Sequence, residues 1–335
     1  MDLIFLISGI ILLVLVTIDL LSTILLMNGG GLISNFICKI IWNLLFKLSN
    51  KNARSSLLAK SGVLIIISLF VTWFLLIWMS FSLIYISDQN SVVDTSTEVI
   101  TSAIGKIYFV GYTVSSLGNG DLKSGSDAWR IFSNVMSMYG TFFISLSISY
   151  LIPVLDAVIK KRALSGYIYQ LGKTPEEIIK NGWNGEDFSI LYSHFNTLYT
   201  MILQHSERHL AYPVLHYFHS TNPKYSAPLT FTILDEAISI QKAFEIDKSP
   251  TAINWNILQE TLESFIDVLD NYNAASKEAV PPFSYQDKIS SLPVNNNREE
   301  IKRVVTELAE RRKTLHGMII HDGWEWKDVI SERQK

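Results

Sequence analysis

The chain has 335 residues, 48% of them hydrophobic, and 28 Lys or Arg against 31 Asp or Glu give it a net charge of −3. Without a basic excess, nothing indicates a nucleic-acid partner, and the single cysteine, Cys38, excludes disulfides within the chain. Residues 1–162 carry 11 basic and 8 acidic residues, whereas residues 163–335 carry 17 and 23. We therefore expect an apolar membrane half followed by a soluble half.

The first membrane span is predicted at residues 3–27, where Asp19 is the only charge. A signal peptide is a weaker interpretation, because no basic segment precedes the run and no cleavage site follows it. For an acid inside a span, a functional role is the default hypothesis, but for Asp19 we favour a hydrogen bond to a neighbouring helix.

An interfacial helix is predicted after the glycines at 29–31. Residues 32–49 are apolar, with a polar residue at every fourth position, which places one polar stripe on a helix: Asn35, Lys39, Asn43 and Lys47. This pattern is typical of a helix that lies in the plane of the membrane surface.

Two further spans are predicted at residues 61–87 and 131–155. Basic residues without acids occupy 28–60, and a basic triplet occupies 160–162, so both segments should be cytoplasmic. The N-terminus and the acidic segment 88–130 would then lie outside, with the C-terminal half in the cytoplasm.

A re-entrant helix is predicted within residues 96–115, which are too polar for a fourth span. Ser96 or Thr97 offers an N-cap, with Glu98 in the first turn. Such a helix, entering from outside, would direct the negative end of its dipole toward the membrane centre, which favours a cation.

The loop that follows has glycine at 118 and 120 and ends at Asp121. Glycine permits the unusual dihedral angles that turn successive carbonyls toward one axis, where they can replace the hydration shell of a cation. The Ser116 hydroxyl would add an inner oxygen ring, and Asp121 would anchor the loop. One loop supplies one quarter of a ring, so the simplest assembly is a homotetramer.

The motif Thr113-x-x-Ser116-Leu117-Gly118-Asn119-Gly120-Asp121 resembles the two-transmembrane, pore-loop potassium channels, whose pattern is Thr-x-x-Thr-Val/Ile-Gly-Tyr/Phe-Gly-Asp. The resemblance covers roughly residues 60–162, and the extra N-terminal span looks like a bacterial subgroup. It implies that K⁺ is bound in a filter supported by Thr113 and Asp121 and formed by Ser116, Leu117, Gly118, Asn119 and Gly120. Gly140 is similar in position to the family's hinge glycine. Gly140 and Pro153 are therefore the candidate bend points of the third span, and packing against the re-entrant helix is the alternative for Gly140.

Asn119 is the main departure from this pattern. The family's aromatic braces the filter against the re-entrant helix, and asparagine would not pack in the same way. Three interpretations remain open: a potassium channel, a weakly selective channel that also passes Na⁺, and a non-conducting sensor or adaptor on a channel scaffold. No arrangement in the sequence indicates an enzyme or an organic cofactor.

The C-terminal half is predicted to be all-helical. Thr174 to Glu177 form a capping box, and three later stretches have helical apolar spacing. Residues 277–297 are predicted to be an exposed loop. The apolar stretches are Phe188, Leu191, Phe195, Leu198 and Ile202; Trp255, Leu258, Leu262, Phe265 and Leu269; and Ile301, Val304, Val305, Leu308 and Leu315.

Four histidines fall within 15 residues and are candidate ligands of a transition metal: His205, His209, His216 and His219. Pro213 between the two pairs should place them on separate helices, and no cysteine is near. We therefore favour structural roles for these histidines.

The sequence thus predicts an all-α membrane protein with three transmembrane helices, a re-entrant pore helix with its filter loop, and a helical cytoplasmic domain. The expected segments are residues 1–58, with the first span and the interfacial helix; 59–162, the pore domain; and 163–335, the cytoplasmic domain. Membrane lipid and three further copies of the chain are the expected partners. The stimulus for gating is not indicated.

Overall fold

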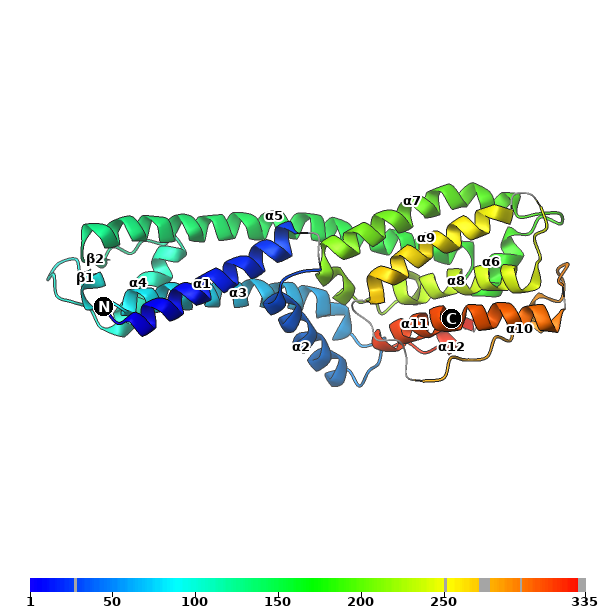
Figure 1. Cartoon of the computed structure of the whole chain (residues 1–335), viewed down its shortest axis with the longest axis horizontal. Helices are drawn as coiled ribbons and strands as arrows, with labels where there is room; N and C mark the ends of the chain where they lie inside the picture. The colour runs from blue at the N-terminus through cyan, green and yellow to red at the C-terminus, as the bar shows by residue number, and fades with distance from the viewer. Residues whose placement is uncertain (27–28, 250–251, 271–277, 296, 331–335) are drawn as a thin grey trace. The chain divides into compact units, whose positions relative to one another are not determined.

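The computed structural model describes residues 1–335 except 27–28, 250–251, 271–277, 296 and 331–335. The described chain is helical apart from one antiparallel pair of short strands (Figure 1). Two compact units are formed. The membrane unit comprises Met1–Ile41, Val63–Leu155 and Ala211–Val214, and the second unit comprises Trp42–Gly62, Asp156–Leu210 and Leu215–Lys335.

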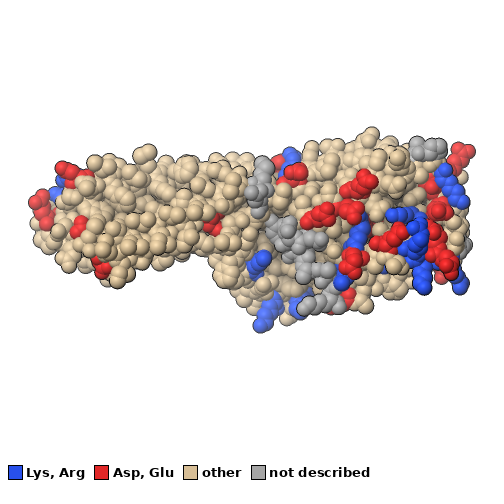
Figure 2. Space-filling model, viewed as in Figure 1, with Lys and Arg blue, Asp and Glu red and all other residues tan. Residues whose placement is uncertain are grey.

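Among the described residues, three helices are long and apolar enough to cross a membrane: α1 (Leu3–Leu25), α3 (Ser61–Ile86) and α5 (Asp127–Leu171). They confirm the spans predicted at 3–27 and 61–87. The visible surface of the membrane unit carries few charged side chains (Figure 2). The all-α membrane class is therefore confirmed.

The third span, predicted at 131–155, lies within α5, which continues as one helix to Leu171 with Pro153 inside it. Beyond 155 the helix passes through Gly166 and ends just before Gly172, where an added Cβ would overlap the amide nitrogen of Ile178. The basic triplet at 160–162 is therefore helical.

The spans of the membrane unit pack through small and polar residues. A Cβ on Gly9 of α1 would lie 2.7 Å from Ile84 of α3, so these two helices approach closely. The Thr17 hydroxyl lies 2.7 Å from that of Tyr139 on α5. Buried aromatic side chains, among them Trp73 and Phe81, fill the space between the helices.

The interfacial helix is confirmed as a helix, α2 (Leu32–Leu48). Asp19 lies 4% exposed within the membrane unit and accepts hydrogen bonds from the amides of Ile33 and Ser34 and from the indole of Trp73. The favoured interpretation of Asp19, a hydrogen bond to neighbouring helices, is therefore confirmed.

The second unit is a helical domain. Thr174 caps α6 as predicted, since its hydroxyl accepts from the Glu177 amide at 3.3 Å. The predicted apolar residues on α7 and α9 are buried where they are described, and the side chain of Leu269 lies outside the described residues. The last predicted stretch divides between α10 and α11. The bounds are α6 (Pro175–Gly182), α7 (Ser189–Ala211), α8 (Ala227–Phe244), α9 (Ile253–Asp270), α10 (Arg298–Glu307), α11 (Ala309–His321) and α12 (Lys327–Ile330).

Helix α8 was not predicted, although it is the most buried helix of the unit, with 16 of its 18 residues buried. Its two buried acids are paired with neighbouring arginines of α11: Asp235 with Arg311, and Glu236 with Arg312 at 2.6 Å. Burial nevertheless raises the pKa of Glu236. These pairs bind α11 to α8 in the core.

The segment 277–297 was predicted as an exposed loop, and this is wrong in part. Tyr285 is 2% exposed and donates its hydroxyl to Glu236 at 2.9 Å, and Ile289 is fully buried in a short 3₁₀ turn. The prolines and asparagines of the segment gave the signal of a loop, whereas the two apolar side chains fill the core beside α8.

Candidate functional site

Residues 92–124 form one closed loop, because the two ends of this segment are paired with each other. Strand β1 (Val92–Asp94) pairs antiparallel with β2 (Leu122–Ser124), with Val92 opposite Ser124. The Thr95 amide also donates to the Asp121 carbonyl at 3.0 Å. Everything between these strands is therefore closed into a single loop, which the sequence did not predict.

Helix α4 (Ala103–Val114) lies within this closed loop. The predicted N-cap at Ser96 or Thr97 is wrong, because the Asp94 carboxylate holds both of their amides in a turn and Glu98 is left-handed with φ 58°. The helix starts later, where the Ser102 hydroxyl accepts from the Gly105 amide at 3.2 Å.

The position of α4 is set by close contacts within the membrane unit. The Trp78 indole of α3 donates to the Ile107 carbonyl at 2.8 Å, and a Cβ on Gly111 would lie 2.9 Å from the same indole. At the other end, a Cβ on Gly140 of α5 would overlap the carbonyl oxygen of Val114. Helix α4 is thus held between α3 and α5.

The loop after α4 alternates in backbone handedness. Ser116, Gly118 and Gly120 have φ of 60°, 63° and 78°, whereas Leu117 and Asn119 between them do not have positive φ. A Cβ on either glycine would meet nothing within 4 Å, so the glycines are required by their dihedral angles and not by lack of space.

The amides of this loop turn back onto α4. Ser116 donates to the Thr113 carbonyl at 3.1 Å, and Leu117 donates to the Tyr112 carbonyl at 2.8 Å. These bonds satisfy carbonyls that the end of a helix leaves open.

The backbone carbonyls of the loop differ in whether they accept a hydrogen bond. Those of Ser116, Leu117, Gly118 and Asn119 accept no hydrogen bond from any residue that the structure describes. The next carbonyl, that of Gly120, accepts from the Thr95 hydroxyl at 2.9 Å. Four successive carbonyl oxygens are therefore available to an external cation or to water.

The predicted supporting residues lie beside this loop. The Thr113 hydroxyl donates within α4, to the Phe109 carbonyl at 2.7 Å. Asp121 anchors the loop through its backbone carbonyl, and its side chain is exposed. The Ser116 hydroxyl lies 3.4 Å from that of Thr141 on α5.

The side chain of Asn119 is directed onto α4. Its amide donates to the Tyr108 hydroxyl at 2.6 Å, and the Tyr108 ring meets that of Tyr112 edge-on at 5.1 Å. The Tyr112 hydroxyl donates in turn to the Leu122 carbonyl at 2.9 Å. Sequence reasoning missed Tyr108; the only signal is its spacing of four from Tyr112, which places both on one face of the helix.

A hollow remains behind the loop. Its volume is about 290 Å³, and it is bounded by α3, α4 and the loop, with Phe74, Trp78, Tyr108, Leu117 and Asn119 among its lining residues. Asn119 therefore ties the loop to α4 by a hydrogen bond without filling the space beside it.

Gly140 and Pro153, the predicted bend points, both lie within the unbroken helix α5. The close contact of Gly140 with Val114 gives this glycine a packing role. A hinge at either position stays a prediction.

The predicted histidines separate as expected at Pro213, with His205 and His209 on α7 and His216 in the following 3₁₀ turn. Their rings form a chain with centroids 5.8 Å and 5.6 Å apart, which His321 of α11 extends at 5.3 Å. Among the described residues, no group of three or more His, Cys, Asp or Glu side chains is arranged to hold a metal ion.

Burial dominates the protonation of these rings. It lowers the pKa of His205 to about 3, with a smaller contribution from the Lys161 ammonium, and it lowers the pKa of His209 and His216 well below the ordinary value. The Lys161 ammonium donates to the carbonyls of Leu215 and Phe218, both at 3.0 Å. The cluster is therefore neutral at pH 7, beside a cation.

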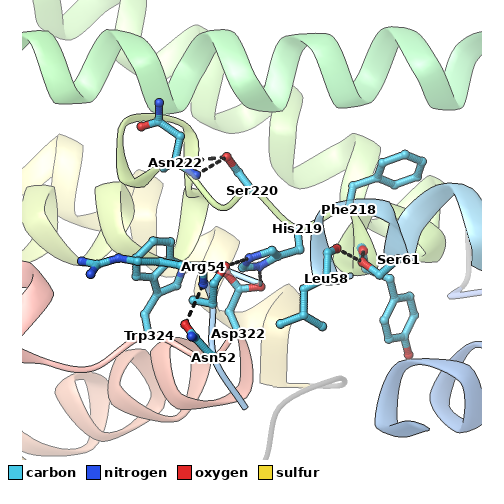
Figure 3. A network of polar contacts seen from close by, with 12 residues as sticks. Asn52, Arg54, Leu58, Ser61, Phe218, His219, Ser220, Asn222, Asp322 and Trp324 are labelled. Atoms are coloured by element: carbon cyan, nitrogen blue, oxygen red, sulfur yellow. Dashed lines mark hydrogen bonds and ion pairs between the residues drawn. The ribbon is translucent and has the colours of Figure 1, made fainter. Parts of the chain in front are cut away.

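His219 has a different environment. Its ring nitrogens lie 2.9 Å from the Asp322 carboxylate and 2.6 Å from the Ala53 carbonyl, and Figure 3 shows the ring directed at Asp322. Although burial alone would lower its pKa, the attraction of Asp322 raises it. His219 thus fastens the 52–54 turn to the end of α11.

Comparison with known proteins places the chain in a family. It is 30% identical over 330 residues to the uncharacterized membrane protein YdjJ of Bacillus subtilis (strain 168), covering 96% of this chain and 95% of the relative. The chain belongs to the same family of membrane proteins as YdjJ. The match extends over nearly the full length, so it includes residues of both units. No family model matches the chain, and no solved structure does.

Proposed function

We propose that this chain is the subunit of a homotetrameric cation channel that conducts K⁺ through a ring of carbonyls from Ser116 to Asn119. The observation that carries the proposal is the set of four carbonyl oxygens without partners, on a backbone that alternates in handedness. Such oxygens can replace the hydration shell of a cation, and conduction is then electrodiffusion without covalent chemistry.

The loop formed by residues 92–124, which β1 and β2 close, supports a re-entrant pore element. Irregular backbone at membrane depth is tolerated where it is buried in protein or lines a water-filled cavity. The loop is exposed in one subunit, and it would line a water-filled cavity if four copies of the chain surrounded a common axis.

The orientation we propose has the N-terminus outside and the second unit in the cytoplasm. The basic residues of 28–60 and 160–162 support it. Impermeant thiol labelling of intact cells tests it, with single cysteines at Thr97 and Lys180 in a Cys38→Ala background. We expect labelling at 97 only, and labelling at 180 alone would reverse the orientation.

A weakly selective channel is the second candidate, favoured by the hollow beside Asn119. The hydrogen bond to Tyr108 supports potassium selectivity instead, because it holds the loop against α4. Reversal potentials in planar bilayers under a K⁺/Na⁺ gradient distinguish the two, for the wild type and for Asn119→Tyr.

A wild-type potential at the potassium equilibrium value would exclude weak selectivity. A potential near zero that Asn119→Tyr shifts toward that value would support weak selectivity caused by Asn119. Absence of current from both proteins, with a correctly assembled tetramer, would favour a non-conducting sensor.

The second unit is proposed to gate or assemble the pore. Helix α5 continues into it, and the Lys161 ammonium ties α5 to the turn after α7. Lys161→Gln should alter the open probability of the channel. It should leave the reversal potential unchanged, because Lys161 is not part of the loop 116–121 that is proposed to select the ion. An unaltered open probability would oppose this coupling.

A further inference from the structure

Helix α2 presents a stripe of large apolar side chains to its surroundings. At 17 residues it is about 25 Å long, shorter than the roughly 30 Å hydrocarbon core of a bilayer, and it carries Lys39 and Lys47. Every fourth residue along one face is exposed, at fractions of 90%, 63%, 47%, 55% and 63%: Leu32, Phe36, Ile40, Leu44 and Leu48.

The opposite face of α2 is already occupied. Cys38 and Trp42 are 4% and 2% exposed. At the first turn, Asp19 accepts from the amides of Ile33 and Ser34. Toward the other end, the Trp42 ring stacks on His321 at 5.7 Å. The apolar stripe lies on the side of α2 opposite to Cys38 and Trp42.

The charges beside the stripe are all positive. Lys39, Lys47 and Lys51 are exposed, and none of them forms an ion pair with a residue that the structure describes. Residues 28–60 contain no acidic residue. Blue side chains project from the segment around α2 in Figure 2.

We propose that this face of α2, the stripe together with Lys39, Lys47 and Lys51, is a docking surface for anionic phospholipid. The apolar side chains enter the acyl region of one leaflet, and the ammonium groups bind the phosphates of the headgroups. Charge complementarity favours lipid over a second copy of the chain, because the same lysines on two copies would repel. The proposal is independent of conduction.

Membrane contact is tested with the full chain in nanodiscs. In a Cys38→Ala background, a bimane label at Leu44→Cys should be quenched by brominated phospholipid, whereas a label at Ile190→Cys should not. Ile190 is a matched control, since it is 55% exposed on a helix of the second unit. Absence of quenching at 44, with disulfide crosslinking between copies of the unlabelled Leu44→Cys protein under an added oxidant, would overturn the proposal in favour of a protein interface.

Headgroup selectivity is tested by native mass spectrometry of the wild-type chain titrated with phosphatidylglycerol. The triple variant Lys39→Gln, Lys47→Gln and Lys51→Gln should need at least about fivefold more lipid for half-saturation, the effect of losing one lysine near an anionic surface. The control variant Lys180→Gln, Lys248→Gln and Lys302→Gln should stay within about twofold. Equal values for both variants, or equal binding of phosphatidylcholine, would refute the site.

Discussion

Asp19 and Ser34 are joined by a double contact between two helices of the membrane unit. The Asp19 carboxylate of α1 accepts from the Ser34 hydroxyl and, at 3.2 Å, from the Ser34 amide at the start of α2. An acid within a span thus serves as the N-cap of the next helix, which explains how a charge is tolerated there.

Replacing Asp19 should loosen this junction. Asp19→Asn keeps one acceptor oxygen and loses the charge, so we expect a loss of about 2 kcal/mol, the value of hydrogen bonds to a charged group. The melting temperature in detergent should fall by roughly 4–8 °C. The control Asp156→Asn, which removes an exposed ion pair with Lys160, should change it little. Equal effects of the two substitutions would contradict the capping role.

Gly140→Ala tests whether this glycine serves packing or bending. An added methyl group would overlap the Val114 carbonyl, so packing requires that the melting temperature falls. Gly166→Ala on the same helix meets only a ring atom of Tyr225 at 3.3 Å and should have a smaller effect. An unchanged or raised melting temperature for Gly140→Ala, together with altered opening, would identify a hinge instead.

The bond between Asn119 and Tyr108 should be measurable in ion selectivity. Tyr108→Phe removes the acceptor oxygen and leaves the ring, so the loop loses its tie to α4 and the K⁺/Na⁺ permeability ratio should fall. The reversal potentials of the wild type, Tyr108→Phe, Asn119→Ala and the double variant form a double-mutant cycle, which measures the coupling between the two side chains. Additive shifts would show that the two side chains act separately.

Acidification should destabilise the second unit through its buried histidines. A histidine whose pKa is lowered on folding binds fewer protons in the folded chain than in the unfolded chain. The free energy of unfolding is therefore at its maximum above about pH 6.5 and decreases as the pH is lowered below that value. His205, His209 and His216 should each contribute a loss on the order of 1 kcal/mol between pH 7.5 and 5.5. His219, with its raised pKa, opposes this trend and offsets part of it.

The pH dependence is checked by thermal unfolding of the full chain at both pH values. His205 stacks on Phe231 and lies against Phe265, so His205→Phe should fit and should reduce the decrease of stability between the two pH values. His194→Gln, outside the cluster, is the control. A His205→Phe variant with the wild-type slope would show that His205 does not titrate on unfolding.

Much of the fold could be predicted because its signals are local. The spans follow from long apolar runs, α2 from a four-residue spacing, and the cap at Thr174 from a motif of four residues. The loop at 116–121 follows from glycine, since its backbone angles require that residue type.

Other features could not be predicted because they depend on residues distant in sequence. Helix α8 is buried on every side and so lacks an apolar stripe. The turn made by Asp94 displaced the start of α4 to Ser102, because a nearby carboxylate competed for the same amides.

The sequence alone determined that this is an all-α membrane protein with a glycine-containing loop at 116–121 between its second and third spans. Only the tertiary structure decided how that loop is closed by β1 and β2, which of its carbonyls are free, and that Asn119 bonds to Tyr108. The physical reason is that helix formation and membrane insertion depend on neighbouring residues, whereas the partners of a polar group depend on which elements pack together.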